Sequence, residues 1–177
     1  MPLKDDYLLA FGRVCEAKGF HLSIEAAKRT GRKLIMAGVL QEPYRQYFEE
    51  KVAPHIDGEQ IVYEGEVSDE RKRELFAHAH AFVFPITWPE PFGLVMIEAM
   101  ATGTPVVALR QGSVPEVVDD GVTGFVVDAD DLDAFEAAVG RVGELDPAVL
   151  RRTVEQRFTV ERMVADYEAI YRRYLDR

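Results

Sequence analysis

The sequence has little cysteine, no excess of basic residues and no long apolar run. Its single cysteine, Cys15, excludes an intramolecular disulfide and a zinc site built from cysteines, and it favours a reducing compartment. The formal net charge is -10, which argues against broad contact with nucleic acid or anionic membranes, because these need clustered cations. No apolar segment approaches the roughly 20 residues of a membrane-spanning helix, and the chain start has no signal-peptide core. We therefore expect a cytoplasmic protein without a transmembrane segment.

Apolar runs alternate with segments of helical periodicity along most of the 177 residues. The expected strands are 7–11, 34–37, 60–63, 81–84, 105–109 and 124–127, and the expected helices are 20–30, 43–52, 69–79, 92–101, 115–118 and 132–144. Two consecutive helices, 147–156 and 160–175, form a C-terminal tail. Strands that alternate with helices predict one α/β domain with a mostly parallel sheet of about six strands and helices on both faces.

In such sheets, ligands bind outside the carboxyl ends of the strands, where helix N-termini offer free amides. The loop after the first expected strand begins at Gly12 and carries Arg13 and Lys18. Because the helix dipole disfavours cations at a helix start, their presence indicates a bound anion. The alternative is that both cations pair with Glu16 or with solvent.

The loop after the fourth expected strand is the richest in unusual residues. Prolines on both sides hold Glu90 in an extended loop. The helix that begins near Phe92, Gly93 and Leu94 offers amides to a phosphate or sugar oxygen. Glu98 lies in that helix among apolar neighbours, and ribose hydroxyls would supply the donors that its carboxylate needs. A surface glutamate bound by water is the alternative.

Two further loops follow strands. The loop after the third strand contains Gly65, Glu66 and Val67, and its glycine would let backbone approach a flat ligand such as a base. A simple tight turn is the alternative. Ser113 stands before the short helix expected at 115–118 and is a candidate N-cap. In the loop after the fourth strand, Trp88 either stacks on a ligand or packs within the loop.

Two patterns that resemble metal sites are better explained otherwise. Asp128 and Asp130 precede an expected helix, where acidic residues complement the dipole. His78 and His80 are two residues apart and point in different directions on a strand or a helix, which makes a poor chelate. We expect no metal site.

Five segments occur in an order that resembles a known family. They are FGRVCEAKG at 11–19, IVYEGEV at 61–67, EPFGLVMIEAMATGTPVVA at 90–108, GSVPEVV at 112–118 and DGVTGFVV at 120–127. Together they resemble the retaining group-1 glycosyltransferases of the two-domain GT-B architecture. The resemblance implies that residues 1–177 are the C-terminal, Rossmann-like domain that binds the nucleotide sugar. It also implies transfer of a hexose with retention of configuration and without a metal, with UDP-glucose as the first candidate donor.

The resemblance also implies roles for individual residues. Glu98 would bind the ribose hydroxyls, and Glu90 would face the transferred sugar. Arg13 and Lys18 would neutralise the departing diphosphate, which needs fixed cations in the absence of a metal. The other implied contacts are backbone amides of Phe92, Gly93 and Leu94 to the donor, the segment Gly65, Glu66 and Val67 against the base, and Gly12 in the first loop. Cys15 stands where these enzymes often have proline.

The same resemblance implies an N-terminal acceptor-binding domain that is absent from these residues. We expect no transfer by this chain alone, because the acceptor site and a histidine near the reacting sugar belong to that domain. One alternative is a nucleotide-binding module or one half of a split transferase. A second is a domain like the sugar-nucleotide epimerases, although the EPFGLVMIE segment and the basic pair fit the transferases better.

Overall fold

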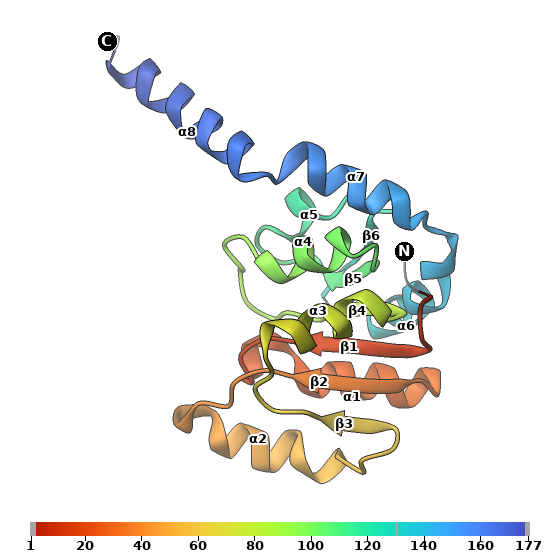
Figure 1. The fold of residues 1–177 in the computed structure, drawn as a ribbon. Helices are drawn as coiled ribbons and strands as arrows, with labels where there is room; N and C mark the ends of the chain where they lie inside the picture. Colours follow the sequence, from red (N-terminus) through yellow and green to blue (C-terminus); the bar gives the residue numbers. More distant parts are fainter. Residues whose placement is uncertain (1–2, 130, 176–177) are drawn as a thin grey trace.

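Six parallel strands form one sheet in the computed structural model, which describes residues 3–129 and 131–175 (Figure 1). The strands are β1 (Tyr7–Phe11), β2 (Lys33–Ala37), β3 (Ile61–Tyr63), β4 (Ala81–Phe84), β5 (Val106–Leu109) and β6 (Gly124–Val127). They lie in the order β3-β2-β1-β4-β5-β6, and every pairing is parallel. The central strands are apolar on both sides because helices cover both faces. The predicted parallel α/β sheet is confirmed.

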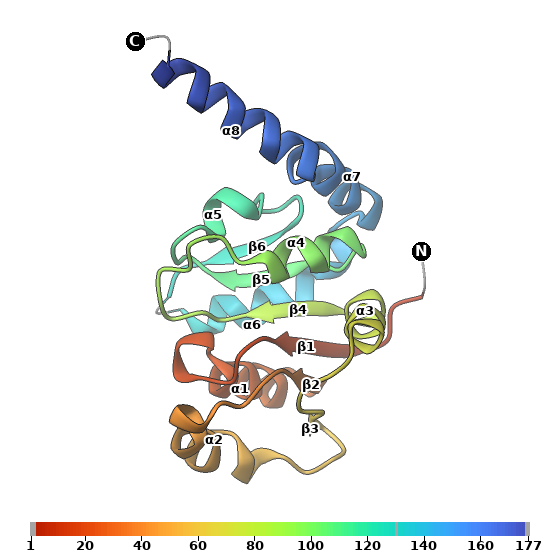
Figure 2. The same ribbon diagram turned by 60° about the vertical axis from the view of Figure 1, so that its left-hand side comes forward.

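The helices divide between the two faces of the sheet (Figure 2). They are α1 (Phe20–Thr30), α2 (Arg45–Lys51), α3 (Asp69–His78), α4 (Leu94–Ala101), α5 (Val114–Val117), α6 (Leu132–Arg141), α7 (Pro147–Arg157) and α8 (Val160–Leu175). Helices α1 and α6 pack together on one face, and α3 and α4 pack together on the other. The neighbouring strands β1 and β4 therefore lead to helices on opposite faces. In open α/β sheets, ligands bind at such a switch point, outside the carboxyl ends of the strands.

Helix α3 is anchored over the junction of β1 and β4 by aromatic packing. The ring of Phe76 lies 5.4 Å from that of Phe11 and 5.3 Å from that of Phe82, between ring centroids. Phe76 and Phe82 are almost fully buried, and burying a phenylalanine contributes about 1.5–3 kcal/mol. This packing fixes the C-terminal turn of α3 on the sheet.

Three of the expected helices differ from the observed ones by more than one residue at an end. The helix predicted for 92–101 begins at Leu94, because Gly93 has a φ of 75° and so cannot belong to a right-handed helix. The segment expected as 43–52 divides into a 3-10 turn and α2, and the segment expected as 132–144 divides into α6 and a 3-10 turn. Short 3-10 turns are common at helix ends, so the order of elements is unchanged.

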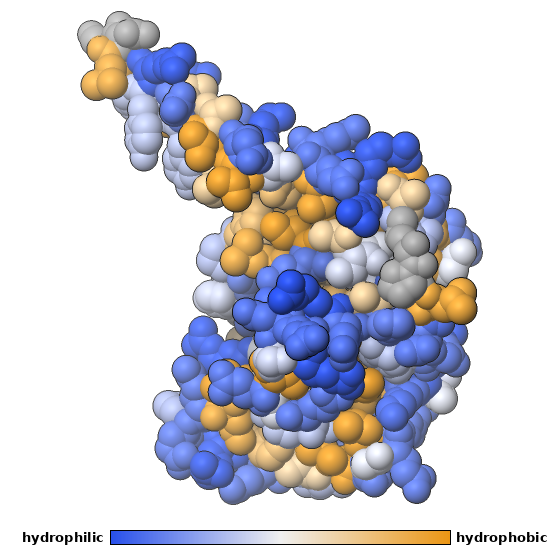
Figure 3. All heavy atoms as spheres, in the orientation of Figure 1, coloured by the Kyte–Doolittle hydropathy of each residue, from blue (hydrophilic) through white to orange (hydrophobic). Residues whose placement is uncertain are grey.

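The C-terminal tail has two parts that behave differently. Helix α7 packs against α4, and Arg157 at its end pairs with Asp119 at 2.7 Å. Helix α8 then projects away from the sheet (Figure 1), and each of its described residues is exposed. Its large apolar side chains follow a helical spacing that places them along one stripe: Val160, Met163, Val164, Tyr167, Ile170, Tyr171, Tyr174 and Leu175. Figure 3 shows apolar surface on this projecting helix.

None of the helices in the described ranges is long and apolar enough to span a bilayer.

Candidate functional site

The loops that follow β1 and β4 meet at the carboxyl edge of the sheet. The amide of Thr87 donates to the carbonyl of Ala17 at 3.0 Å, which ties the two loops together. This contact joins the predicted cationic loop to the predicted glutamate loop, although they are about 70 residues apart in the sequence. The switch point therefore carries one continuous surface built from both.

Lys18, Trp88 and Glu90 form a tight cluster on this surface. The Lys18 ammonium makes an ion pair with Oε2 of Glu90, and the Trp88 indole Nε1 donates to the same oxygen at 3.0 Å. The ammonium also lies 5.4 Å from the Phe84 ring centroid and 5.7 Å from that of Trp88, where aromatic faces attract cations. Within the described ranges no hydrogen bond reaches Oε1 of Glu90. One carboxylate oxygen is held, and the other is available to a ligand.

The loop between β5 and α5 braces the backbone that carries Glu90. The Ser113 amide donates to the Glu90 carbonyl at 2.9 Å, and the Ser113 hydroxyl donates to the Phe92 carbonyl at 2.9 Å. Ser113 occupies the N-cap position of α5 as expected, but its hydroxyl serves the neighbouring loop and makes no capping bond. Gly112, with a φ of 51°, lies directly against the Glu90 backbone. The GSVPE segment therefore supports the Glu90 loop from behind.

The start of α4 provides free backbone donors beside this cluster. The amides of Leu94 and Val95 precede the first intrahelical bonds. Phe92 is 43% exposed, and its ring contacts that of Phe158 with 6.1 Å between centroids. An anion placed here would meet the positive end of the helix dipole as well as Lys18.

Glu98 is paired with a lysine that the sequence patterns did not single out. Lys72, in the first turn of α3, donates to Oε1 of Glu98 at 2.9 Å. The two side chains are 24% and 37% exposed. Both residues line a pocket of about 520 Å³ between α3 and α4, together with Asp69, Arg73, Phe76, Ala101 and Thr102. The half-buried carboxylate therefore has a donor from the protein itself.

The remaining residues of the predicted site stand along the same edge of the sheet. The amide of Gly12 donates to the carbonyl of Ala37 at 3.0 Å, and the Gly38 amide donates to the carbonyl of Gly65 at 2.7 Å. These bonds bring the loops after β1, β2 and β3 together. The segment with Gly65, Glu66 and Val67 has an exposed Glu66 and half-buried neighbours.

This segment is anchored by an ion pair just before it. The Arg71 guanidinium donates to both carboxylate oxygens of Glu64, at 2.7 and 3.0 Å. These hydrogen bonds lower the pKa of Glu64. By contrast, Arg13 is exposed and makes no hydrogen bond or ion pair with the residues that the structure describes. The structure therefore brings Lys18 to Glu90 but leaves Arg13 apart from both.

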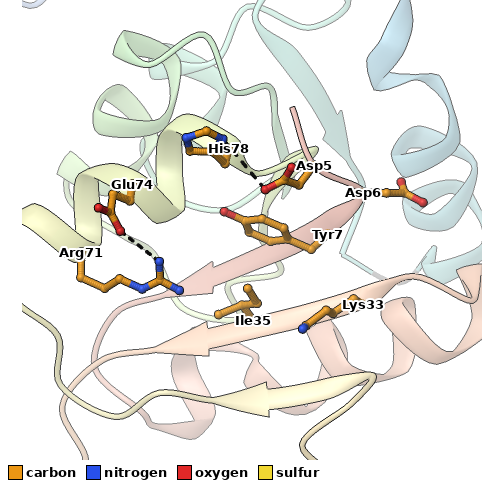
Figure 4. A pocket seen from close by; sticks show the side chains of 8 residues that line it. All are labelled: Asp5, Asp6, Tyr7, Lys33, Ile35, Arg71, Glu74 and His78. Atoms are coloured by element: carbon orange, nitrogen blue, oxygen red, sulfur yellow. Dashed lines mark hydrogen bonds and ion pairs between the residues drawn. The ribbon is translucent and has the colours of Figure 1, made fainter. Parts of the chain in front are cut away.

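A second pocket, of about 530 Å³, lies at the other end of the strands (Figure 4). Tyr7 and Lys33, the first residues of β1 and β2, line it. The Tyr7 hydroxyl donates to the Leu75 carbonyl at 2.7 Å, and burial raises the pKa of that hydroxyl. The Arg71 and Glu74 side chains in this pocket pair with each other at 3.0 Å. This pocket is separate from the switch point.

The residues weighed as metal ligands do not gather. In residues 3–129 and 131–175, no three His, Cys, Asp or Glu side chains are placed to hold an ion together. Asp130 lies outside the described residues. The metal-independence of the site stays a prediction.

The family of the chain follows from a comparison with known protein families. The family model described as glycosyl transferases group 1 matches residues 1–156. The chain belongs to this family. The sheet order and helical cover of this group 1 glycosyltransferase chain are also those of solved GT-B enzymes.

Three related proteins show how far the similarity extends. The D-inositol 3-phosphate glycosyltransferase of Streptomyces griseus subsp. griseus is 45% identical over 85 residues, which cover 48% of this chain and 18% of that protein. The GDP-mannose-dependent alpha-(1-6)-phosphatidylinositol monomannoside mannosyltransferase of Mycolicibacterium smegmatis is 32% identical over 142 residues, which cover 75% of this chain and 37% of that protein. Sucrose-phosphate synthase from Thermosynechococcus elongatus aligns with a TM-score of 0.80 and 28% identity over 97% of this chain and 46% of that one. The chain spans less than half the length of each.

Proposed function

We propose that this chain is the donor-binding domain of a retaining hexosyltransferase that uses a nucleoside diphosphate sugar. The observation that carries the proposal is the cluster of Lys18, Trp88 and Glu90 beside the N-terminus of α4. It places a cation, a carboxylate and free amides together at the switch point, where open α/β sheets bind nucleotides. Membership of the group 1 glycosyltransferase family supports the same reading.

Lys18 and Glu90 would act at the bond that breaks. The bond between the anomeric carbon and the diphosphate oxygen breaks, and its electron pair leaves with the diphosphate. An acceptor hydroxyl oxygen forms the new bond to that carbon and passes its proton to the departing diphosphate. Lys18, Arg13 and the amides at Phe92, Gly93 and Leu94 would stabilise this negative charge. Glu90 would face the sugar, where positive charge develops. In the structure the Lys18 ammonium pairs with the Glu90 carboxylate. A bound diphosphate would therefore be a second anion beside Lys18.

The nucleoside would extend from this cluster toward α3. Glu98 would accept hydrogen bonds from the ribose, and the segment Gly65, Glu66 and Val67 would lie against the base beyond Gly12. UDP-glucose is the first candidate donor. The Mycolicibacterium smegmatis relative is named as GDP-mannose-dependent, so GDP-mannose is the second.

An acceptor-binding domain would complete the enzyme. The relatives are more than twice as long as the matched part, and the exposed apolar stripe of α8 offers a contact surface for a further domain. We propose that sugar transfer requires that domain, whereas donor binding does not. A separate chain that supplies the domain would fit the same stripe.

Calorimetric titration tests the proposal directly. The chain is titrated with UDP, GDP and ADP, each with and without EDTA, and then with UDP-glucose and GDP-mannose. We expect one nucleotide to bind, to bind equally in EDTA, and to bind more tightly as its sugar conjugate. Absence of binding by all three nucleotides would contradict a donor site in this chain. Loss of binding in EDTA would contradict its metal-independence.

A further inference from the structure

The ion pair between Lys72 and Glu98 connects α3 to α4 next to the proposed nucleoside position. The Lys72 ammonium donates a hydrogen bond to Oε1 of Glu98 at 2.9 Å. Within the described part of the chain, no hydrogen bond reaches Oε2. The Glu98 side chain is 37% exposed, so a ligand in the adjoining pocket can reach the second oxygen. The pair thus has one satisfied and one open acceptor.

Lys72 is itself well held. It lies in the first turn of α3, whose start is capped by the Ser68 hydroxyl accepting from the Arg71 amide at 3.2 Å. Its ammonium is also 5.9 Å from the ring centroid of Phe11, the last residue of β1. A lysine fixed by a capped helix and an aromatic ring restricts the carboxylate that it binds to one orientation.

This orientation matters because an ionised carboxylate forms strong hydrogen bonds only to hydroxyls that it meets in line. We propose that Lys72 is a positioning residue for ribose recognition: it holds Glu98 so that Oε2 accepts from a ribose hydroxyl. Lys72 would thereby set the preference of this chain for ribonucleotides over deoxyribonucleotides. The inference rests on the proposed donor site and adds a residue to it.

The test compares ribose recognition with general nucleotide affinity. The chain, its Lys72→Met and Lys72→Arg variants and the control Lys51→Met are titrated with UDP, GDP and ADP and with their 2′-deoxy and 3′-deoxy forms. Lys51 is an exposed lysine on α2, so its substitution removes the same charge away from the pocket. Thermal unfolding of each variant confirms that it folds.

We expect the unsubstituted chain to prefer the ribonucleotide over at least one deoxy form by about tenfold, the value of a charge-assisted hydrogen bond. Lys72→Met should weaken binding of the ribonucleotide by about fivefold and binding of that deoxy form by less than about twofold. The reason is that a freely rotating Glu98 carboxylate loses only its hydrogen bond to the ribose hydroxyl. Lys72→Arg should restore most of the preference, and Lys51→Met should not change it.

The contrary outcomes separate this inference from the proposed function. Equal weakening of both forms by Lys72→Met would mean that the lysine acts through general attraction to phosphate, and it would overturn the inference. Nucleotide binding without any ribose preference would overturn the inference and leave the proposed function standing. Absence of all nucleotide binding would overturn both. If Lys72→Met does not fold, Lys72→Gln is compared in the same way.

Discussion

Substitution of Gly112 by alanine adds one methyl group next to the Glu90 backbone. It tests whether the contacts of the loop between β5 and α5 position Glu90. In Gly112→Ala the new Cβ would lie 2.3 Å from the Glu90 carbonyl oxygen and 2.4 Å from the Glu90 nitrogen. Both are backbone atoms, so no side-chain rotation relieves the contact, and the loop with Glu90 must move. Gly121 offers a matched control, because its φ is 72° and nothing lies within 4 Å of its Cβ position.

The two substitutions share one cost and differ in the other. An alanine in the left-handed region costs about 1–2 kcal/mol, and overpacking adds about 1–3 kcal/mol. We therefore expect Gly121→Ala to lower the free energy of unfolding by about 1–2 kcal/mol and Gly112→Ala by about 2–5 kcal/mol. Urea unfolding at constant pH measures both. Equal losses for the two variants would refute the crowding at Gly112.

The same pair of variants reports on function. Because Glu90 is proposed to face the sugar, Gly112→Ala should remove the extra affinity of the sugar conjugate over the bare nucleotide. Gly121→Ala should keep it. Calorimetric titration with both ligands gives this ratio for each variant. A normal ratio in Gly112→Ala would show that the brace does not position Glu90.

Three further predictions concern single side chains. Glu98→Ala should weaken the bare nucleotide by about tenfold, whereas Glu90→Ala should weaken mainly the sugar conjugate; small and equal effects in titrations of both variants would sink these assignments. Trp88→Phe keeps a ring beside Lys18 but loses the indole donor to Glu90, so it should lower affinity for the sugar conjugate by about threefold to tenfold, and an unchanged conjugate affinity would contradict this. Burial lowers the pKa of His21 below its ordinary 6.5, and its Nδ1 shares a hydrogen bond with the Tyr47 hydroxyl at 2.8 Å. Stability should therefore be complete above about pH 6.5 and decline as the pH falls below it, and the melting temperature of His21→Gln should decline less over the same range; identical pH profiles would exclude His21 as a source.

The fold was predictable because hydrophobic periodicity is local. Each strand is a short apolar run, and each helix shows its own spacing, so the alternation indicates a parallel sheet covered on both faces. The start of α4 was predicted two residues early, because the positive φ of Gly93 cannot be recognised from the sequence alone. The cytoplasmic location inferred from Cys15 stays a prediction.

The candidate site was predictable in outline but not in its pairings. The loops after strands converge in any sheet of this type, which is why Lys18 and Glu90 were expected at one edge. Ion pairs between elements depend on exact helix positions. Lys72 therefore carried no sequence signal beyond its place in the first turn of a helix beside the site. For Arg13 the structure shows the solvent-exposed alternative, which sequence alone could not separate from anion binding. The roles assigned to these residues remain proposals.

The projecting helix α8 has a practical consequence for work with the isolated chain. Its apolar stripe displays tyrosine, isoleucine, methionine and leucine side chains to water on a rod that leaves the body of the protein. Such a rod is a site for concentration-dependent self-association. Light scattering of the chain across a dilution series, beside a version ending at Thr159 that keeps the contact of Phe158 with Phe92, would show how much of the self-association comes from this one helix. The shorter version keeps the switch point and is therefore the better starting material for crystals with nucleotide.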